Sequence, residues 1–499
     1  MGEPFAVPPS RRVFCNRTLN LRSIGAIGYD MDYTLVHYRV DTWERHAYDH
    51  LRRLLAADGW PVGDLEFEPE AVARGLIVDS ELGNIVKANR FGYVMRAAHG
   101  TRLLDHETQR ELYRHLPVNL AEPRFFFLNT LFSLSESCLF AQLVDLYDDR
   151  RLSGVVGYED LFRRVRATLD HAHLEGTLKA EIIADPERFV DVDPDAPAAL
   201  VDQKQAGKRL MLISNSEWAY AREIMAFAYD PLLPRGVTWR DLFELVIVGA
   251  RKPDFFSVAL PLLRIVDDER GLLAPEPQGF PGPGLYQGGD ADAVERYLDL
   301  SGSEILYVGD HIWADVHASK RTLRWRTALI LRELEGELEA IAGFRDSERE
   351  LVRLMVEKET LEREVATLRL TLQRRAHGEE PRVDAPTPRL RSRLDELHRR
   401  LTALDERIAP LARRASELHN ERWGLLLRSG NDKSHLARQV ERSADVYTSR
   451  VGNLLHITPF AYLRATRGSM PHDPPIAVDG GETSDVSLPS ADDPGGAEG

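Results

Sequence analysis

Four short apolar runs in this chain each end in residues that suit phosphate or metal chemistry. The first run, Ser23 to Tyr29, is small, apolar and compatible with a buried strand. It is followed at once by two carboxylates, Asp30 and Asp32, and in an open α/β sheet ligands bind at this carboxyl end of a strand. A chain that repeats this unit is constrained to a mainly parallel sheet whose polar residues meet at one edge.

The side chains of Asp30 and Asp32 point to the same side of an extended chain because they are two residues apart. Like charges so close need a metal ion, a shared proton or solvent. Magnesium with a phosphate ligand fits, since hard cations prefer oxygen ligands. A solvated acidic turn is the simpler explanation of a lone Asp-x-Asp, but Asp-x-Asp-x-Thr behind an apolar run is more specific.

The second run, Arg209 to Ile213, ends in Ser214, Asn215 and Ser216. A hydroxyl at a strand end can bind a phosphate oxygen, and so can the N–H groups at the start of the following helix. Taken alone the signal is weak, because Ser-Asn-Ser is also a good helix cap.

The third run, Phe243 to Val248, leads to Lys252, which could clamp the charge of a phosphate and of an attacking carboxylate. The fourth, Glu304 to Gly309, ends in Asp310, and Asp315 follows five residues later. Gly-Asp-x-x-x-x-Asp after an apolar strand predicts metal ligands at the same sheet edge as the first pair.

Composition limits the function classes. With 499 residues the chain has room for two or three domains, and its hydrophobic content of 43% is ordinary. No apolar run reaches the ~18 residues that span a bilayer, and residues 1–12 lack a signal-peptide core, so we expect no membrane partner. Two cysteines are too few for a disulfide framework, which predicts a cytoplasmic location. A net charge of −15 argues against nucleic acid as a partner.

The stretch between the first two runs is too long for a loop, so we interpret it as a cap over the sheet. Beyond the last strand come charged helical sequence and then an acidic tail rich in Gly, Pro and Ser, which we expect to be disordered. The predicted units are a core domain (1–38 and 199–332), an inserted cap (39–198), a helical coiled-coil hairpin (333–425), a helical segment packing on the core (426–470) and the tail (471–499).

In the cap, residues 158–184 show a helical pattern in which Arg166, Asp170 and His173 share one face, and Lys179 follows. A solvated amphipathic face explains this pattern equally well. The run 124–132 is rich in aromatics and ends in Phe132. Core packing is the usual role of such a run, although one aromatic at its end could form a stacking platform.

From Leu390 to Leu418 apolar residues keep a strict heptad spacing, and a proline-containing linker separates this stretch from the helical sequence at 333–375. Two helices joined by a short loop are typical of an antiparallel coiled-coil hairpin. We assign this hairpin no chemistry and expect it to be structural or to form a homo-oligomer, a dimer or a tetramer.

Taken together and in this order, the four motifs resemble the haloacid dehalogenase-like phosphatase superfamily. The resemblance implies an α/β fold with a doubly wound, Rossmann-like and mainly parallel sheet. It implies that Asp30 attacks phosphorus to form an aspartyl-phosphate, and that Asp32 protonates the leaving alcohol and then activates water. The implied catalytic residues are Asp30, Asp32, Ser214 and Lys252, and the implied Mg²⁺ site comprises Asp30, Asp32 through its backbone carbonyl, Asp310 and Asp315.

A narrower resemblance rests on Asp30-Met-Asp-Tyr-Thr-Leu, Arg74-Gly-Leu, Leu128-Asn-Thr-Leu-Phe132, Ala250-Arg-Lys-Pro253 and Tyr307-Val-Gly-Asp-His-Ile312. These motifs are similar to those of the cytosolic purine 5′-nucleotidase family, which prefers IMP and GMP, and the chain resembles a bacterial-type member. The resemblance implies a purine ring stacked between a Phe and a His, with cap residues contacting base and sugar. The implied substrate-binding residues are Phe132, Arg166, Asp170, His173, Lys179, Asn215 and Ser216.

Two other functions stay open at this point. The chain could be a related phosphatase or nucleoside phosphotransferase acting on another phosphomonoester. It could also be a non-catalytic scaffold that assembles through its heptad helices, although the intact acids and lysine of the four motifs count against this.

Overall fold

The computed structural model describes residues 7–175 and 177–466, without the side chains of 170–175 and 177. The predicted disordered tail at 471–499 lies outside the described residues. A ten-stranded sheet forms the centre of the molecule, in the order β1-β20-β17-β16-β3-β11-β12-β15-β13-β14. Pairing is parallel from β20 to β15 and antiparallel at both edges. This confirms the predicted α/β fold class with a mainly parallel, Rossmann-like sheet.

The four strands that the apolar runs predict, β3, β11, β12 and β16, are short and apolar. The central strand β3 (Ala26–Tyr29) is fully buried and lies between β16 and β11. Gly28 in β3 is required here, because a Cβ atom at this position would lie 2.9 Å from the ring of Tyr307. The other core strands are β11 (Arg209–Ile213), β12 (Leu245–Val248), β13 (Leu262–Asp267), β14 (Leu272–Pro275), β15 (Gly284–Gly288), β16 (Ile305–Gly309) and β17 (Arg326–Ile330).

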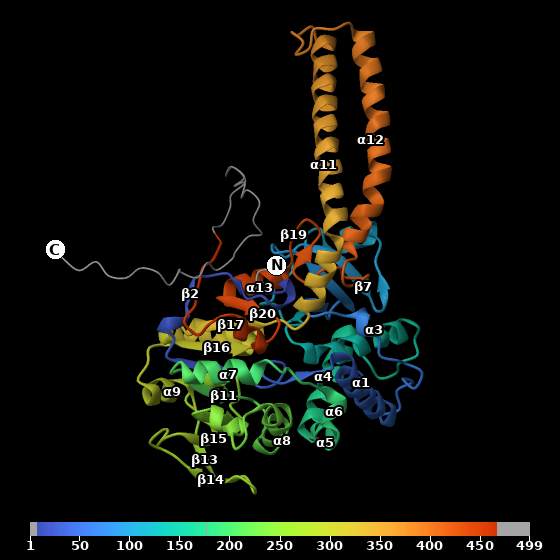
Figure 1. Cartoon of the computed structure of the whole chain (residues 1–499). Helices are drawn as coiled ribbons and strands as arrows, with labels where there is room; N and C mark the ends of the chain where they lie inside the picture. Colours follow the sequence, from blue (N-terminus) through green and yellow to red (C-terminus); the bar gives the residue numbers. More distant parts are fainter. Residues whose placement is uncertain (1–6, 176, 467–499) are drawn as a thin grey trace, which may run out of the picture.

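Helices connect these strands and cover the sheet (Figure 1). They are α7 (Ala196–Gln205), α8 (Trp218–Tyr229), α9 (Ala291–Leu298) and α10 (Ala318–Leu323). Each parallel crossover through a helix returns the chain to the same edge of the sheet, so the carboxyl ends of β3, β11, β12 and β16 lie together.

The segment between β3 and β11 folds into helices and a separate antiparallel sheet in the order β8-β7-β6-β5-β9. In this sheet β5 (Ile77–Asp79) pairs with β6 (Asn84–Ala88) as an antiparallel hairpin. The remaining strands of this antiparallel sheet are β7 (Val94–His99), β8 (Arg102–Leu103) and β9 (Phe125–Phe127). The helices are α1 (Val40–Ala57), α2 (His106–Tyr113), α3 (Leu134–Asp148), α4 (Gly157–Glu175), α5 (Thr177–Ala184) and α6 (Pro186–Phe189). The exact limits of the cap stay a prediction.

The predicted helical hairpin projects from the body as two long antiparallel helices, α11 (Leu334–Ala376) and α12 (Thr387–Ser416) (Figure 1). Their seam buries leucines at the heptad positions, among them Leu361, Leu397 and Leu404. The second helix ends before Leu418, because the chain turns at His419, where φ is +68°, to bury Trp423. Within the described part of the chain, we find no helix with the length and apolarity that crossing a membrane requires.

The C-terminal segment holds more strand than the sequence predicts. After α13 (His435–Ser443), β20 (Val446–Thr448) joins the main sheet beside β17, and β1 (Phe14–Cys15) closes that edge. A second small pair joins β2 (Leu19–Asn20) to β21 (Tyr462–Leu463). Three β-compatible residues are enough here because β20 extends an existing sheet whose edge would otherwise expose unpaired backbone groups.

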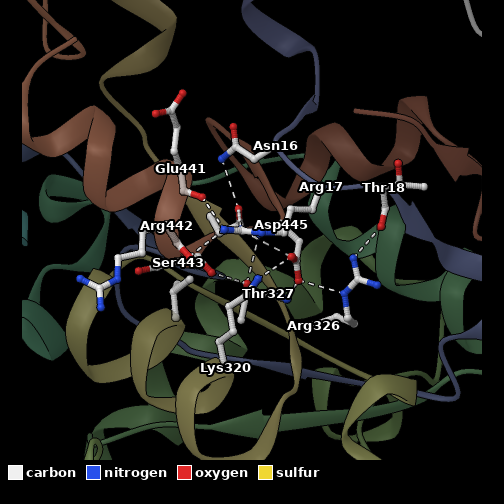
Figure 2. Close-up of polar contacts among 12 residues, drawn as sticks. Asn16, Arg17, Thr18, Lys320, Arg326, Thr327, Glu441, Arg442, Ser443 and Asp445 are labelled. Carbon is white, nitrogen blue, oxygen red and sulfur yellow. Dashed lines mark hydrogen bonds and ion pairs between the residues drawn. The ribbon is translucent and has the colours of Figure 1, made fainter. Parts of the chain in front are cut away.

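A buried carboxylate, Asp445, ties this edge of the sheet together (Figure 2). It is 2% exposed and accepts hydrogen bonds from Lys320, from the Arg326 side chain at 2.9 Å and from the Thr327 N–H at 3.1 Å. Its backbone carbonyl accepts from the Arg17 N–H at 3.0 Å. One residue therefore holds the N-terminal arm, α10, β17 and β20 in register.

We expect Asp445→Asn to lower the free energy of unfolding by about 2–3 kcal/mol, because it removes the charge shared by several cations at a buried site. Urea denaturation measures this. Asp346→Asn is the matched control, since the Asp346–Arg349 pair is almost fully exposed and should contribute under ~1 kcal/mol. Equal effects of the two substitutions would show that the Asp445 network has no special role.

Candidate active site

The structure brings together residues from all four predicted strand ends. Asp30 follows β3, Ser214 follows β11, Lys252 lies just beyond β12 and Asp310 follows β16. The Lys252 amine lies 2.6 Å from Asp30 Oδ1 and 2.8 Å from Asp315 Oδ1. A single buried cation therefore joins three of the motifs.

Three carboxylates converge around this lysine. One oxygen each of Asp30, Asp310 and Asp315 lies within 4.8 Å of the others, and all three residues are buried. Gly309 makes the approach possible, because a Cβ atom there would lie 2.5 Å from Asp315 Oδ2. Three buried anions beside one cation leave a surplus of negative charge, and their oxygens are the ligands that Mg²⁺ prefers.

The electrostatics reflect this surplus. Burial raises the pKa of Asp30 well above its usual range; Lys252 opposes the shift, and Asp315 and Asp310 add to it. Burial also raises the pKa of Asp310 to about 7, against the opposing charge of Arg74. Burial alone would lower the pKa of Lys252, but Asp30 and Asp315 hold that pKa well above the ordinary lysine value. A divalent cation at the three carboxylates would favour their charged forms.

Asp32 lies in a different environment from the three converging acids. Its Oδ1 accepts a hydrogen bond from the Tyr38 hydroxyl at 2.5 Å, and its Oδ2 accepts one from the Ser216 hydroxyl at 2.6 Å. Tyr38 in turn lies 2.8 Å from the Tyr220 hydroxyl. The Asp32 side chain is thus held by hydroxyl groups and not by cations, which suits a group that gives and takes a proton.

The loop after β11 supports the loop after β12, which carries Lys252. The Asn215 side chain accepts from the Lys252 N–H at 2.6 Å and donates to the Lys252 carbonyl at 3.0 Å. Ser214 is fully buried, and its hydroxyl accepts from the Ser216 N–H at 3.0 Å. Asn215 therefore fixes the backbone that carries the lysine, whereas its predicted contact with substrate stays a prediction.

The cap contributes two of the predicted substrate residues close to this centre. The Lys179 amine, from α5, lies 3.1 Å from the Ser216 hydroxyl, which itself bonds to Asp32. Phe132 packs edge-on against Tyr33, with ring centroids 4.6 Å apart. These contacts connect the predicted substrate residues of the cap with Asp32 and its neighbour Tyr33.

Arg166 lies further along the cap, with its guanidinium 4.1 Å from the centroid of the Phe126 ring and its Nε 3.8 Å from Glu136. The structure shows no contact between Arg166 and the strand-end residues among the described side chains. The backbone of Asp170 and His173 belongs to α4, but their side chains lie outside the described residues.

Sequence reasoning missed several residues that the site uses. Tyr38 holds Asp32, and the Tyr307 hydroxyl accepts from the Lys252 amine at 3.1 Å. The guanidinium of Arg74 donates to the backbone carbonyls of Asp310 and Asn129. The motifs Arg74-Gly-Leu and Tyr307-Val-Gly-Asp-His-Ile312 were signals for two of these positions, whereas nothing in the sequence around Tyr38 identifies a hydrogen-bond partner.

Comparisons with known proteins identify the family of this chain. A model of the 5′ nucleotidase family matches residues 13–475. The chain belongs to the 5′ nucleotidase family. A 5′-nucleotidase domain-containing protein of Dictyostelium discoideum is 26% identical over 476 residues, which are 92% of this chain and 74% of that protein. As a 5′ nucleotidase family member, the chain is a phosphoric monoester hydrolase.

The solved structures that resemble this chain share less sequence identity with it than the Dictyostelium protein does. An archaeal β-phosphoglucomutase from Pyrococcus sp. strain ST 04 is 12% identical, with 62% of this chain and 86% of that chain covered and a TM-score of 0.29. A HAD phosphatase from Thermococcus onnurineus is 14% identical, with 62% and 87% covered and a TM-score of 0.22.

A buried acid on α1 interacts electrostatically with Tyr33, which packs against Phe132. Glu44 is fully buried on α1, and its Oε2 accepts from the Ser135 N–H at 2.9 Å. Burial raises the pKa of Glu44 to about 8, although the Ser135 hydrogen bonds oppose the shift. The folded state thus holds a proton on Glu44 that the unfolded chain releases near pH ~4.3.

We therefore expect Glu44 to make the protein less stable as the pH rises from about 5 to about 8. Glu44→Gln should remove this loss and stabilise the protein by about 2–4 kcal/mol above pH 8, with little change at pH 5. Urea denaturation of both proteins from pH 5 to 9 tests this. A constant difference between them across that range would contradict the assignment.

Proposed function

We propose that the chain hydrolyses purine nucleoside 5′-monophosphates, namely IMP, GMP and their deoxy forms, to nucleoside and phosphate with Mg²⁺ as cofactor. The observation that carries this proposal is the convergence of Lys252 with the carboxylates of Asp30 and Asp315, beside Asp310. Such a centre combines a buried nucleophile with the positive charge needed to hold an anionic phosphate.

In the first step the Asp30 carboxylate attacks phosphorus, and the bond from phosphorus to the 5′ oxygen breaks. Asp30 Oδ1 already accepts from the Met31 N–H at 2.8 Å and pairs with Lys252, so we assign the attack to Oδ2. Asp32 gives its proton to the leaving oxygen. The products of this step are the nucleoside and a phosphoryl group on Asp30.

In the second step Asp32 takes a proton from water, whose oxygen attacks the same phosphorus. The bond from phosphorus to Asp30 breaks, and phosphate leaves. Ser214 and Lys252 hold phosphate oxygens through both steps. Asp30, Asp310 and Asp315, with the Asp32 carbonyl, would hold Mg²⁺, which neutralises charge on the phosphoryl group.

The purine preference is supported by the cap. Phe132 would stack on the base, opposite His173, while Arg166 and Asp170 would contact its polar edge and Lys179 the sugar. The neighbouring Glu136, 3.8 Å from Arg166, orients that guanidinium. A site built to hydrogen-bond a 6-oxo purine leaves polar groups unpaired with other bases, and so rejects them.

Phosphate release from the common nucleoside monophosphates tests this proposal. We expect IMP and GMP to be hydrolysed at least ~10-fold more efficiently, by kcat/KM, than pyrimidine nucleotides and sugar phosphates, because mismatched polar edges cost about 1–3 kcal/mol. EDTA should abolish turnover and Mg²⁺ should restore it. A preference for sugar phosphates would favour the alternative, a phosphatase for another phosphomonoester, and transfer to added nucleosides would favour a phosphotransferase.

We also propose that the chain acts as a cytoplasmic homo-oligomer. Both cysteines are free thiols in the structure, which fits a reducing compartment. The projecting hairpin of α11 and α12 offers an extended surface on which copies of the chain could pair, as a dimer or a tetramer.

A further inference from the structure

The three acids of the candidate metal centre differ in what holds their side chains. Asp30 and Asp315 each pair with Lys252, at 2.6 Å and 2.8 Å. Asp310 has no ion pair of this kind among the described residues, and the one hydrogen bond to its carboxylate comes from the Thr130 hydroxyl, at 3.4 Å from Oδ2. Thr130 belongs to the inserted segment, in the loop after β9. The insertion therefore supplies a contact that the core lysine does not.

A second residue of the insertion, Arg74, holds the backbone of Asp310. Its guanidinium donates through Nη2 to the Asp310 carbonyl, through Nη1 to the Ile330 carbonyl at 3.4 Å and through Nε to the Asn129 carbonyl at 3.1 Å. The Arg74 side chain is only 1% exposed, and the carboxylate of Glu333 lies further away, at 3.6 Å. Hydrogen bonds from a charged donor are stronger than neutral ones. Arg74 therefore ties the ends of β16 and β17 to the loop after β9.

The segment that carries Arg74 is itself attached to that loop. The Gly75 N–H donates to the Leu128 carbonyl at 2.7 Å, and the Leu128 N–H donates to the Leu76 carbonyl at 2.9 Å. Gly75 has a φ of +87°, and a Cβ atom there would lie 2.8 Å from Leu436 on α13, so this close approach requires glycine. The two side chains that reach the metal ligand from the insertion therefore belong to one hydrogen-bonded unit.

We propose that Arg74 is a positioning residue for the metal centre, which fixes Asp310 and, through the Asn129 carbonyl, sets Thr130 against the Asp310 carboxylate. Docking of the insertion on the core thus completes the metal site as well as covering it. Removal of a residue that holds a metal ligand in place typically costs about 10–100-fold in metal affinity or activity. This inference rests on the proposed Mg²⁺-dependent function, but not on the identity of the nucleotide.

Calorimetric titration of the full chain with MgCl₂ alone tests the inference without any measurement of activity. Arg74→Ala should weaken Mg²⁺ binding at least ~10-fold, and Thr130→Val, which keeps the shape of the side chain, roughly 3-fold, because its hydrogen bond is long. Arg124→Ala is the matched control. It removes another arginine of the insertion, which pairs with Asp79 at 2.7 Å and contacts no residue of the metal centre among the described side chains. It should lower stability and leave Mg²⁺ affinity unchanged.

The side chain of Arg74 also lines a cavity of about 640 Å³ at the base of the α11–α12 hairpin. Arg74→Ala therefore leaves space that a small cation can reach through this cavity. Millimolar guanidinium, far below the molar range that unfolds proteins, should restore most of the lost Mg²⁺ affinity. Urea is planar and similar in size but uncharged, and it should restore none. Neither compound should change Mg²⁺ binding by the wild-type chain.

Arg74→Lys covers the case in which Arg74→Ala does not fold. It keeps the charge but loses the planar fork that reaches three carbonyls, so we expect an intermediate loss of Mg²⁺ affinity. Wild-type affinity in the Arg74 and Thr130 variants would overturn this inference and leave the proposed function intact. Equal rescue by urea would also overturn it, because the side chain would then act by filling space. A wild-type chain that does not bind Mg²⁺ would overturn the proposed cofactor, and this inference with it.

Discussion

Asp30→Asn is expected to reduce phosphate release from IMP by ~10⁴-fold or more, because an amide cannot form the covalent bond to phosphorus that the proposed mechanism requires. The fold should survive. The Lys252–Asp315 contact at 2.8 Å remains, and the substitution removes one of three crowded acids. Since burial raises the pKa of Asp30, its charged form is costly at neutral pH, and the variant should melt at the same or a higher temperature in metal-free buffer.

Asp292→Asn, at an exposed position on α9, is the control and should retain full activity. Initial rates with IMP and thermal melts of the three proteins give the comparison, and mass spectrometry excludes deamidation of the introduced amide back to a carboxylate. Turnover by Asp30→Asn within ~10-fold of wild type would remove Asp30 from the role of nucleophile.

The strand-end residues could be predicted from the sequence because each depends on local structure. A buried strand such as β3 needs apolar residues, and the residue that follows it lies at the edge of the sheet. Lys252 and Asp310 could therefore be assigned to the same edge as Asp30 without knowledge of the tertiary structure. Parallel pairing through β16, β3, β11 and β12 then brings them together.

The surroundings of Asp32 could not be predicted in this way. Tyr38 reaches Asp32 from β4, a two-residue strand (His37–Tyr38) that pairs with β10 (Val190–Asp191) at the far end of the inserted segment. Ser216 reaches the other oxygen from the core. Such contacts depend on how the inserted segment folds back onto the core, and no residue spacing in the sequence predicts that arrangement. The same holds for β20, which pairs with β17 although the whole α11–α12 hairpin separates the two strands in the chain.

Lys252→Met is the substitution for which we expect activity and stability to fall together. Loss of the amine removes positive charge from the site of the phosphoryl group and should lower kcat by about 10²–10³-fold. It also leaves Asp30, Asp310 and Asp315 as buried like charges, which should cost about 3–5 kcal/mol of unfolding free energy at pH 8 without divalent metal.

The pH dependence of the destabilisation distinguishes the loss of a compensating charge from a simple loss of packing. The pKa of Asp310 is raised to about 7 in the folded state, against about 3.9 when unfolded, so charging it lowers stability between about pH 4 and 7. Without Lys252, Asp30 and Asp310 hold their protons to higher pH, and the destabilisation of Lys252→Met should grow from pH 5 to pH 8. Added Mg²⁺ should recover part of it, because a cation at the three carboxylates replaces the missing charge.

Urea denaturation at pH 5 and pH 8, with and without Mg²⁺, measures both effects. Lys433→Met is the matched control, since Lys433 is partly exposed and pairs with the exposed Glu441, so the change should stay within ~1 kcal/mol at either pH. A Lys252→Met deficit that is equal at both pH values and unaffected by Mg²⁺ would mean that the lysine acts through packing. The surplus of negative charge, and with it the metal site inferred from three converging carboxylates, would then lose its physical basis.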